Sequence, residues 1–136
     1  MGYSLGSKAL LLLFHSIILI GAGHGIGILL FLDITTLNGS YIDSISRNVL
    51  ENYQARLAFT GLISILGKAL IILSIFKHQS LLSKRLADIG QVFLTISFFI
   101  LIIGDWSFLN LYILSAISGI PFFLYTIRIF YLKYWQ

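Results

Sequence analysis

The chain contains no cysteine and one proline, and only 10% of its 136 residues are charged. Without cysteine it has no disulfide, no thiol nucleophile and no thiolate metal ligand. Hydrophobic residues make up 58% of the sequence, so apolar surface is in large excess. A chain of this length buries only about two-thirds of its unfolded surface on folding, and the excess must face lipid or partner subunits. We therefore expect an integral membrane protein with a single transmembrane domain.

Four apolar stretches are long enough to cross a bilayer, which takes about 20 helical residues. They cover residues 9–32, 55–76, 87–104 and 107–131. Helix is expected because the runs are continuous and because a backbone exposed to lipid must satisfy its own hydrogen bonds. Short connections make consecutive spans antiparallel neighbours. The sequence therefore predicts an all-α, up-down bundle of four transmembrane helices.

Two local features modify this arrangement. Pro121 lies inside the fourth span and predicts a kink there. The longest polar connection, residues 33–54, carries Ile42, Ile45, Val49 and Tyr53 at helical spacing, with a Ser40-x-x-Asp43 start signal. We expect a short amphipathic helix there, on the outer face between the first two spans.

The distribution of basic residues predicts the orientation in the membrane. Lysine and arginine concentrate on the cytoplasmic side of membrane proteins, and six of them fall on one side of the four-span arrangement: Lys8, Lys77, Lys84, Arg85, Arg128 and Lys133. Both termini are therefore expected in the cytoplasm. The cations are scattered among apolar spans, which argues against a nucleic-acid partner. The expected partners are the lipid bilayer and either further copies of the chain or other membrane subunits.

The first span contains four glycines in seven residues: Gly21, Gly23, Gly25 and Gly27. Each costs about 1 kcal/mol relative to alanine inside a helix, so a compensating feature is expected. Spacing of four residues between small side chains favours close packing of transmembrane helices, which is our first interpretation. The alternatives are that the glycines clear space around His24 for a ligand or cofactor, or that the helix unwinds locally.

The histidines do not form a shared ligand set. His15 and His24 are nine residues apart, which places them on opposite faces of one helix, so they cannot bind the same metal or haem. A haem held between the His24 residues of two symmetric copies is an alternative. Otherwise no cofactor and no metal site are expected. For His15 we expect a neutral imidazole bonded to a neighbouring helix.

Lys68 is the charged residue placed deepest in a predicted span. A charge near the bilayer centre costs about 2.5 kcal/mol or more, and Asp88 and Asp105 lie only at span ends. No carboxylate is therefore expected at its depth, which favours an uncharged amine, an outside partner, water, or snorkelling to the inner headgroups. The residues that share its helical face, expected to point away from lipid, are Thr60, Ser64 and Gly67.

Other polar residues inside the spans are expected to bond between helices. Gln91 and Thr95 lie one turn apart and, like Ser64, are candidates for lining a pore or ligand site. Ser115, Ser118 and Gly119 offer a seam of small residues in the fourth span.

No catalytic constellation is apparent in the sequence. The leading functional prediction is a non-enzymatic, oligomeric or complex-embedded membrane subunit that forms a pore or anchors partners. One alternative is a haem- or ligand-binding membrane protein that uses His24. The other is a small anion transporter that uses Lys68.

Overall fold

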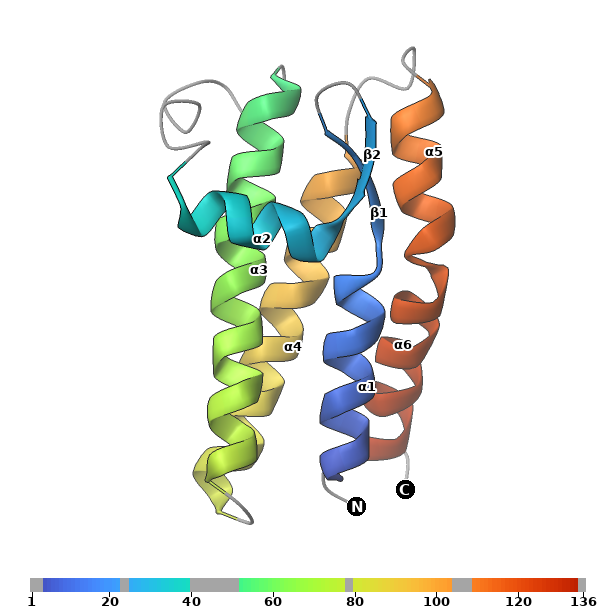
Figure 1. Cartoon of the computed structure of the whole chain (residues 1–136). Helices are drawn as coiled ribbons and strands as arrows, with labels where there is room; N and C mark the ends of the chain where they lie inside the picture. Colours follow the sequence, from blue (N-terminus) through green and yellow to red (C-terminus); the bar gives the residue numbers. More distant parts are fainter. Residues whose placement is uncertain (1–3, 23–24, 40–51, 78–79, 104–108, 135–136) are drawn as a thin grey trace.

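The computed structural model describes residues 4–22, 25–39, 52–77, 80–103 and 109–134, which are mostly helical. Long helices lie side by side along one axis, and one short helix crosses them (Figure 1). The elements are α1 (Leu5–Ser16), β1 (Leu19–Ala22), β2 (Gly25–Ile28), α2 (Leu29–Leu37), α3 (Tyr53–Phe76), α4 (Leu81–Ile102), α5 (Leu109–Ser118) and α6 (Ile120–Tyr134). The start of α1 and the end of α6 lie at the same end of the molecule.

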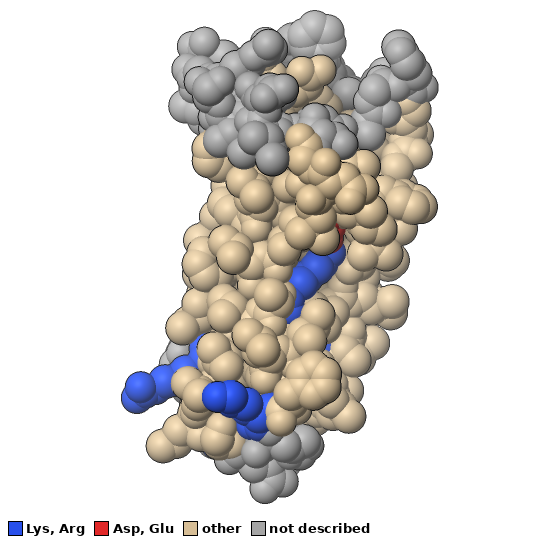
Figure 2. Space-filling view, turned by 60° about the vertical axis from the view of Figure 1, so that its left-hand side comes forward, with Lys and Arg blue, Asp and Glu red and all other residues tan. Residues whose placement is uncertain are grey.

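Two helices, α3 and α4, are long and apolar enough to cross a membrane, and α5 with α6 forms a third candidate. The predicted spans 55–76 and 87–104 therefore correspond to α3 and α4. Large apolar side chains remain exposed on these helices, for example Leu66, Phe76 and Val92. The face drawn in Figure 2 is mostly uncharged: basic side chains gather near one end, and one further basic side chain lies at mid-height beside an acidic one. These surfaces suit contact with lipid better than contact with water.

The fourth predicted span is broken, which confirms the kink expected at Pro121. The axes of α5 and α6 differ by 45°. Pro121 has no N–H to donate to the carbonyl one turn earlier. Gly119 lies at the break, against the ring of Phe98. A Cβ atom at this position would overlap that ring. The bend therefore combines a missing backbone bond with a close contact between α4 and the break.

The first predicted span is not a continuous helix, and this part of the four-span prediction is wrong. After α1 ends, β1 and β2 form an antiparallel pair in which Leu19 is opposite Ile28 and Ala22 is opposite Gly25. Local unwinding, one of the three interpretations of the glycines, is the one observed for the described part of this segment. Its physical reason is the helical cost of glycine together with the two-residue alternation of Gly25–Ile28, which suits a strand.

The hairpin obtains backbone hydrogen bonds from side chains of neighbouring helices. Ser115 Oγ donates to the carbonyl of Leu19 at 2.7 Å, and the Leu19 N–H donates to Ser118 Oγ at 2.9 Å. The hydroxyl of Tyr53 donates to the carbonyl of Gly21 at 2.7 Å. Non-helical backbone at membrane depth is tolerated only where protein or a wet cavity satisfies it. The seam of small residues in α5 therefore stabilises β1.

Close approach of α3 and α4 depends on a glycine in each helix. A Cβ added to Gly90 would lie 2.8 Å from the carbonyl oxygen of Gly67 and 2.7 Å from Ile71 Cγ1. The same two helices are tied to α1 at the end where the chain begins. There, Lys8 Nζ donates to the Ser74 carbonyl at 2.9 Å and to Ser83 Oγ at 3.0 Å.

The amphipathic helix predicted around Ile42, Ile45 and Val49 lies outside the described residues. The chain is described again from Asn52, whose side chain accepts a hydrogen bond from the Gln54 N–H at 2.9 Å. This cap sets the start of α3 at Tyr53, two residues before the predicted start of the second span.

The glycine contact between α3 and α4 generates a test. We expect Gly90→Ala to lower the free energy of unfolding by about 1–3 kcal/mol, because overpacking forces the two backbones apart. The matched control is Gly6→Ala, since a Cβ there would meet only Ser4 Oγ at 3.9 Å; it should be neutral or slightly stabilising. Thermal unfolding in detergent micelles measures both. Equal stability of the two variants would contradict the packing described here.

Candidate functional site

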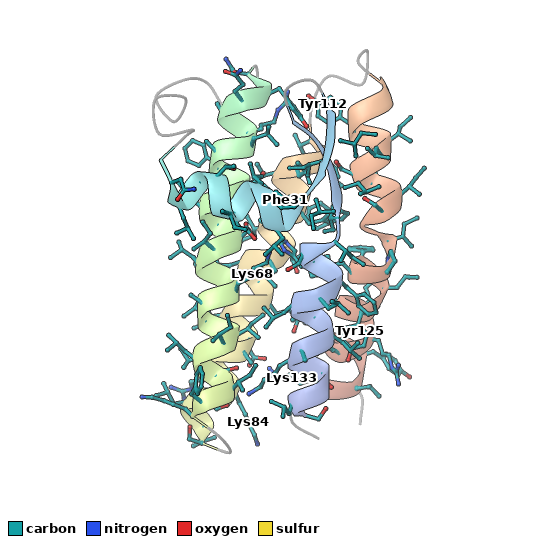
Figure 3. The ribbon with its side chains drawn as sticks, in the orientation of Figure 1. Phe31, Lys68, Lys84, Tyr112, Tyr125 and Lys133 are labelled. Carbon is teal, nitrogen blue, oxygen red and sulfur yellow. The ribbon has the colours of Figure 1, made fainter. Side chains whose placement is uncertain are left out.

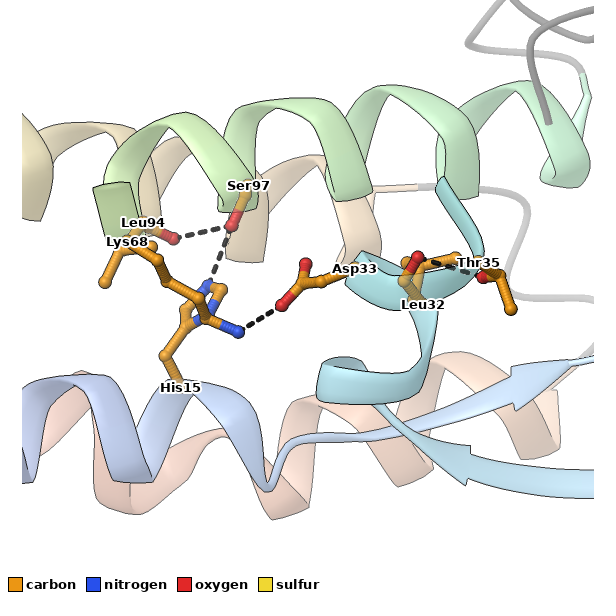
Figure 4. Close-up of polar contacts among 7 residues, drawn as sticks. All are labelled: His15, Leu32, Asp33, Thr35, Lys68, Leu94 and Ser97. Carbon is orange, nitrogen blue, oxygen red and sulfur yellow. Dashed lines mark hydrogen bonds and ion pairs between the residues drawn. The ribbon is translucent and has the colours of Figure 1, made fainter. Parts of the chain in front are cut away.

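Lys68 of α3 forms an ion pair with Asp33 of α2 (Figure 4). Their side chains are only 11% and 7% exposed. The expectation that Lys68 has no carboxylate at its depth is therefore wrong. The sequence prediction assigned Asp33 to the outer connection. In the structure, the antiparallel strands β1 and β2 reverse the chain, and α2 carries Asp33 back to the level of Lys68. The amine bonds to α2 and does not extend along α3 toward Phe76.

The ion pair lies deep within the bundle. Lys68 is well separated from Tyr112 toward one end and from Lys84 at the other (Figure 3). Removing two charges from water costs several kcal/mol per ion, and their attraction compensates only when the remaining lone pairs also find partners. Among the described residues, however, Asp33 Oδ1 has no hydrogen-bond partner. The carboxylate therefore keeps one acceptor for something else.

Side chains of α2 and α3 face each other where the two helices cross. A Cβ atom on Gly61 would overlap the hydroxyl of Thr36, so the helices touch at that point. One turn along α3, the hydroxyl of Ser64 interacts with the Asp33 carboxylate, although not in hydrogen-bonding geometry. Thr60, one turn before Ser64, is completely buried, as is Ser64. The polar face predicted for the second span therefore points inward, as expected.

His15 approaches the same region from α1. Its Nε2 lies 2.8 Å from Ser97 Oγ, and its ring packs edge-on against Phe122 at a centroid distance of 4.9 Å. Ser97 Oγ in turn donates to the Leu94 carbonyl at 3.0 Å. The His15 ring lies beside the Lys68 side chain (Figure 4), and its Nδ1 has no hydrogen-bond partner among the described residues. The predicted bond from His15 to another helix is confirmed.

These side chains form one polar cluster, which we call the core polar site and define as His15, Asp33, Thr36, Thr60, Ser64 and Lys68. Five of its six members have a buried polar atom without a hydrogen-bond partner in the part of the chain that the structure describes: His15 Nδ1, Asp33 Oδ1, Thr36 Oγ1, Thr60 Oγ1 and Ser64 Oγ. Most buried polar groups in native proteins do have partners. This concentration of exceptions indicates a place for bound water or a ligand.

Two predicted candidates lie elsewhere. Gln91 Nε2 donates to the Thr126 carbonyl of α6 at 3.2 Å, which confirms the expected bond between helices. Thr95 donates instead to the Gln91 carbonyl of its own helix at 2.9 Å, so the expected bond from Thr95 to a neighbouring helix is wrong. Both line a groove of about 350 Å³ between α4 and α6. An ion pair between Asp88 and Lys133 lies in the same groove.

Gly25 and Gly27, which the structure describes, do not pack one helix against another. A Cβ on Gly25 would meet nothing within 4 Å, and one on Gly27 would meet only Ile20 at 3.9 Å. Gly21 lies in β1, where its carbonyl accepts from Tyr53. Gly23 and His24 lie outside the described residues. The haem hypothesis depends on His24 and therefore stays a prediction.

Within the described ranges, no three His, Asp or Glu side chains converge in a way that could hold a metal ion. Comparisons of the chain with protein-family models, curated proteins and solved structures found no match in any of the three. Interpretation of the core polar site therefore depends on its own chemistry. The sequence pattern identified Lys68, Ser64 and His15, but it missed Asp33 and Thr36.

The ion pair predicts strongly coupled substitutions. Lys68→Met and Asp33→Asn should each lower the free energy of unfolding by about 3–5 kcal/mol, because each leaves a buried charge without its partner. The double variant should recover most of that loss. The half-exposed pair Asp88–Lys133, with each side chain 33% exposed, provides the matched control, and its single variants should cost at most about 1 kcal/mol. Additive losses in the Asp33 and Lys68 cycle would show that the two side chains do not interact.

Proposed function

We propose that the protein is a small, non-enzymatic membrane transport subunit, working as an oligomer or within a complex, and that the core polar site binds its solute. The observation that carries this proposal is the buried Asp33–Lys68 ion pair with unpartnered polar atoms around it. Ionisable residues within membrane segments are costly, and they usually mark solute or ion pathways.

The interrupted elements support the same proposal. Between α1 and α2 the chain forms strands, and the α5–α6 bend comes directly after the serines that bond β1. Secondary transporters commonly bind solute where membrane helices are discontinuous, because freed backbone and side-chain groups face a cavity there.

A purely anchoring role explains the ion pair less well. Replacing a buried ion pair by apolar side chains of similar size is often neutral or stabilising, so an anchor has no need of one. The pair also bears on the anion hypothesis for Lys68. Because Asp33 compensates the charge of the amine, the site offers an anion no net positive charge.

We further propose that both termini are cytoplasmic. The start of α1, the end of α3, the start of α4 and the end of α6 all lie at one end of the molecule. Basic residues that the structure describes at or near these ends are Lys8, Lys77, Lys84, Arg85, Arg128 and Lys133. Such an accumulation is typical of the cytoplasmic side.

Flux measurements test the transport proposal. The full chain is reconstituted into phosphatidylcholine–phosphatidylglycerol vesicles and assayed with a panel of radiolabelled sodium, rubidium and chloride. We expect flux of at least one probe. Lys68→Met should reduce this flux about tenfold or more, and so should Ser64→Ala, a substitution that leaves the ion pair intact. Lys133→Met, which removes a lysine of the other ion pair, should keep the rate. Folded protein that moves none of the probes, or flux unchanged in both core variants, would refute the proposal.

Orientation is tested separately with an accessibility tag at each terminus. Both tags should be protected in intact cells and should become reactive only after the membrane is permeabilised. Protection of one tag alone would place the termini on opposite sides and would contradict the proposed topology.

A further inference from the structure

We infer that the crossing of α2 and α3 is a binding site for a small monovalent cation of the sodium class, with oxygen ligands from Asp33, Thr36, Thr60 and Ser64. This inference rests on the proposed function, for which it names the class of solute. It assigns a role to the oxygen atoms of the core polar site that the ion pair leaves unused.

The ligand set consists entirely of oxygen atoms. One is a carboxylate oxygen, Asp33 Oδ1, and the other three are the hydroxyls of Thr36, Thr60 and Ser64. Each is buried and has no hydrogen-bond partner among the residues described by the structure. Hard cations of groups 1 and 2 prefer oxygen ligands, whereas zinc and copper sites use imidazole or thiolate.

Helical spacing directs these oxygens toward one place. Asp33 and Thr36 are three residues apart on α2, and Thr60 and Ser64 are four apart on α3, so each pair shares one helix face. Thr36 contacts α3 at Gly61, and Ser64 interacts with Asp33. Both contacts lie on the same two faces, so the oxygens of Asp33, Thr36 and Ser64 lie between the crossing helices. Thr60, one turn before Ser64 on the same face of α3, is the fourth ligand that we infer. Gly61 is required for this crossing, because a side chain there would push Thr36 away.

The charge of the site favours a monovalent ion. A single carboxylate belongs to the proposed ligand set, and the other carboxylate among the described residues, Asp88, pairs with Lys133 in the groove between α4 and α6. Calcium sites normally use several carboxylates, and magnesium keeps strict octahedral coordination with its waters. While Lys68 is bound to Asp33 Oδ2 the pair is neutral, so the site attracts a cation only when the ammonium leaves the carboxylate, and a single carboxylate then suits a monovalent ion better than a divalent one.

Lys68 then acts as a tethered competitor. Its ammonium is itself a monovalent cation held on Asp33, and its four-carbon stem is flexible. When the free cation binds, the ammonium moves from Asp33 toward Nδ1 of His15, which has no partner among the residues described. The structure corresponds to the state in which Lys68 occupies the carboxylate.

Direct binding tests this inference. Full-length protein in nanodiscs is titrated with radiolabelled sodium in a proximity assay, with lithium and potassium as competitors. We expect saturable binding that Asp33→Asn abolishes and that Ser64→Ala and Thr36→Val each weaken about tenfold or more. Lys68→Met should bind sodium more tightly than the native chain, because the competitor is gone.

Thr126→Val is the matched control, because Thr126 Oγ1 is also buried without a partner in the described chain but lies on α6. It should bind sodium as the native protein does. The inference is overturned if folded native protein shows no saturable sodium or lithium binding up to about 0.15 M salt. It is also overturned if Ser64→Ala binds as tightly as Thr126→Val.

The binding and flux assays separate the two proposals. Flux of some probe that depends on Lys68, without sodium binding, would overturn the cation site and leave transport intact. Sodium binding that depends on Ser64, without flux of any probe, would support the site and refute transport.

Discussion

A lysine ammonium inside an apolar bundle needs an anion, and the path of the chain between α1 and α3 supplies one. Because the strands β1 and β2 reverse the direction of the chain, α2 returns toward the middle of the bundle and Asp33 meets Lys68. If residues 9–32 formed one helix, Asp33 would lie at the end of that helix. The pairing, the contact of Thr36 with α3 and the inward face of Ser64 all follow from this reversal.

The reversal in turn depends on side chains from distant parts of the sequence. The backbone N–H and carbonyl groups on the outer edge of a strand have no partner within the sheet. For Leu19, the side chains of Ser115 and Ser118 provide these hydrogen bonds. Both serines lie in the last turns of α5, just before the bend at Gly119 and Pro121. The hairpin, the broken helix and the core polar site therefore form one interdependent unit, whereas α3 and α4 form a more regular pair joined at Gly67 and Gly90.

Hydropathy and proline placement predicted α3, α4 and the bend between α5 and α6, because each depends on local composition. The first span could not be read in the same way, since a helix–hairpin–helix is as apolar as a straight helix. Two signals did point to it: the cost of four glycines, and the alternation of glycine and isoleucine in β2. Asp33 was not predicted as the partner of Lys68 for the same reason. Its predicted depth assumed that residues 9–32 form one helix, which the strands β1 and β2 interrupt. Ser64 and Lys68 were found because helical periodicity holds throughout α3.

The pairing of β1 with β2 is the step on which this account depends, and the absence of native cysteine makes it directly measurable. Leu19 and Ile28 are opposite each other, and the N–H and carbonyl of Leu19 bond to α5, away from β2. A Leu19→Cys, Ile28→Cys variant should therefore form an intramolecular disulfide under mild oxidation in native membranes, detected by mass spectrometry. In a continuous helix the two positions would be about 13 Å apart, beyond the reach of a disulfide. Two thiols that stay free after oxidation would contradict the chain reversal and the ion pair that follows from it.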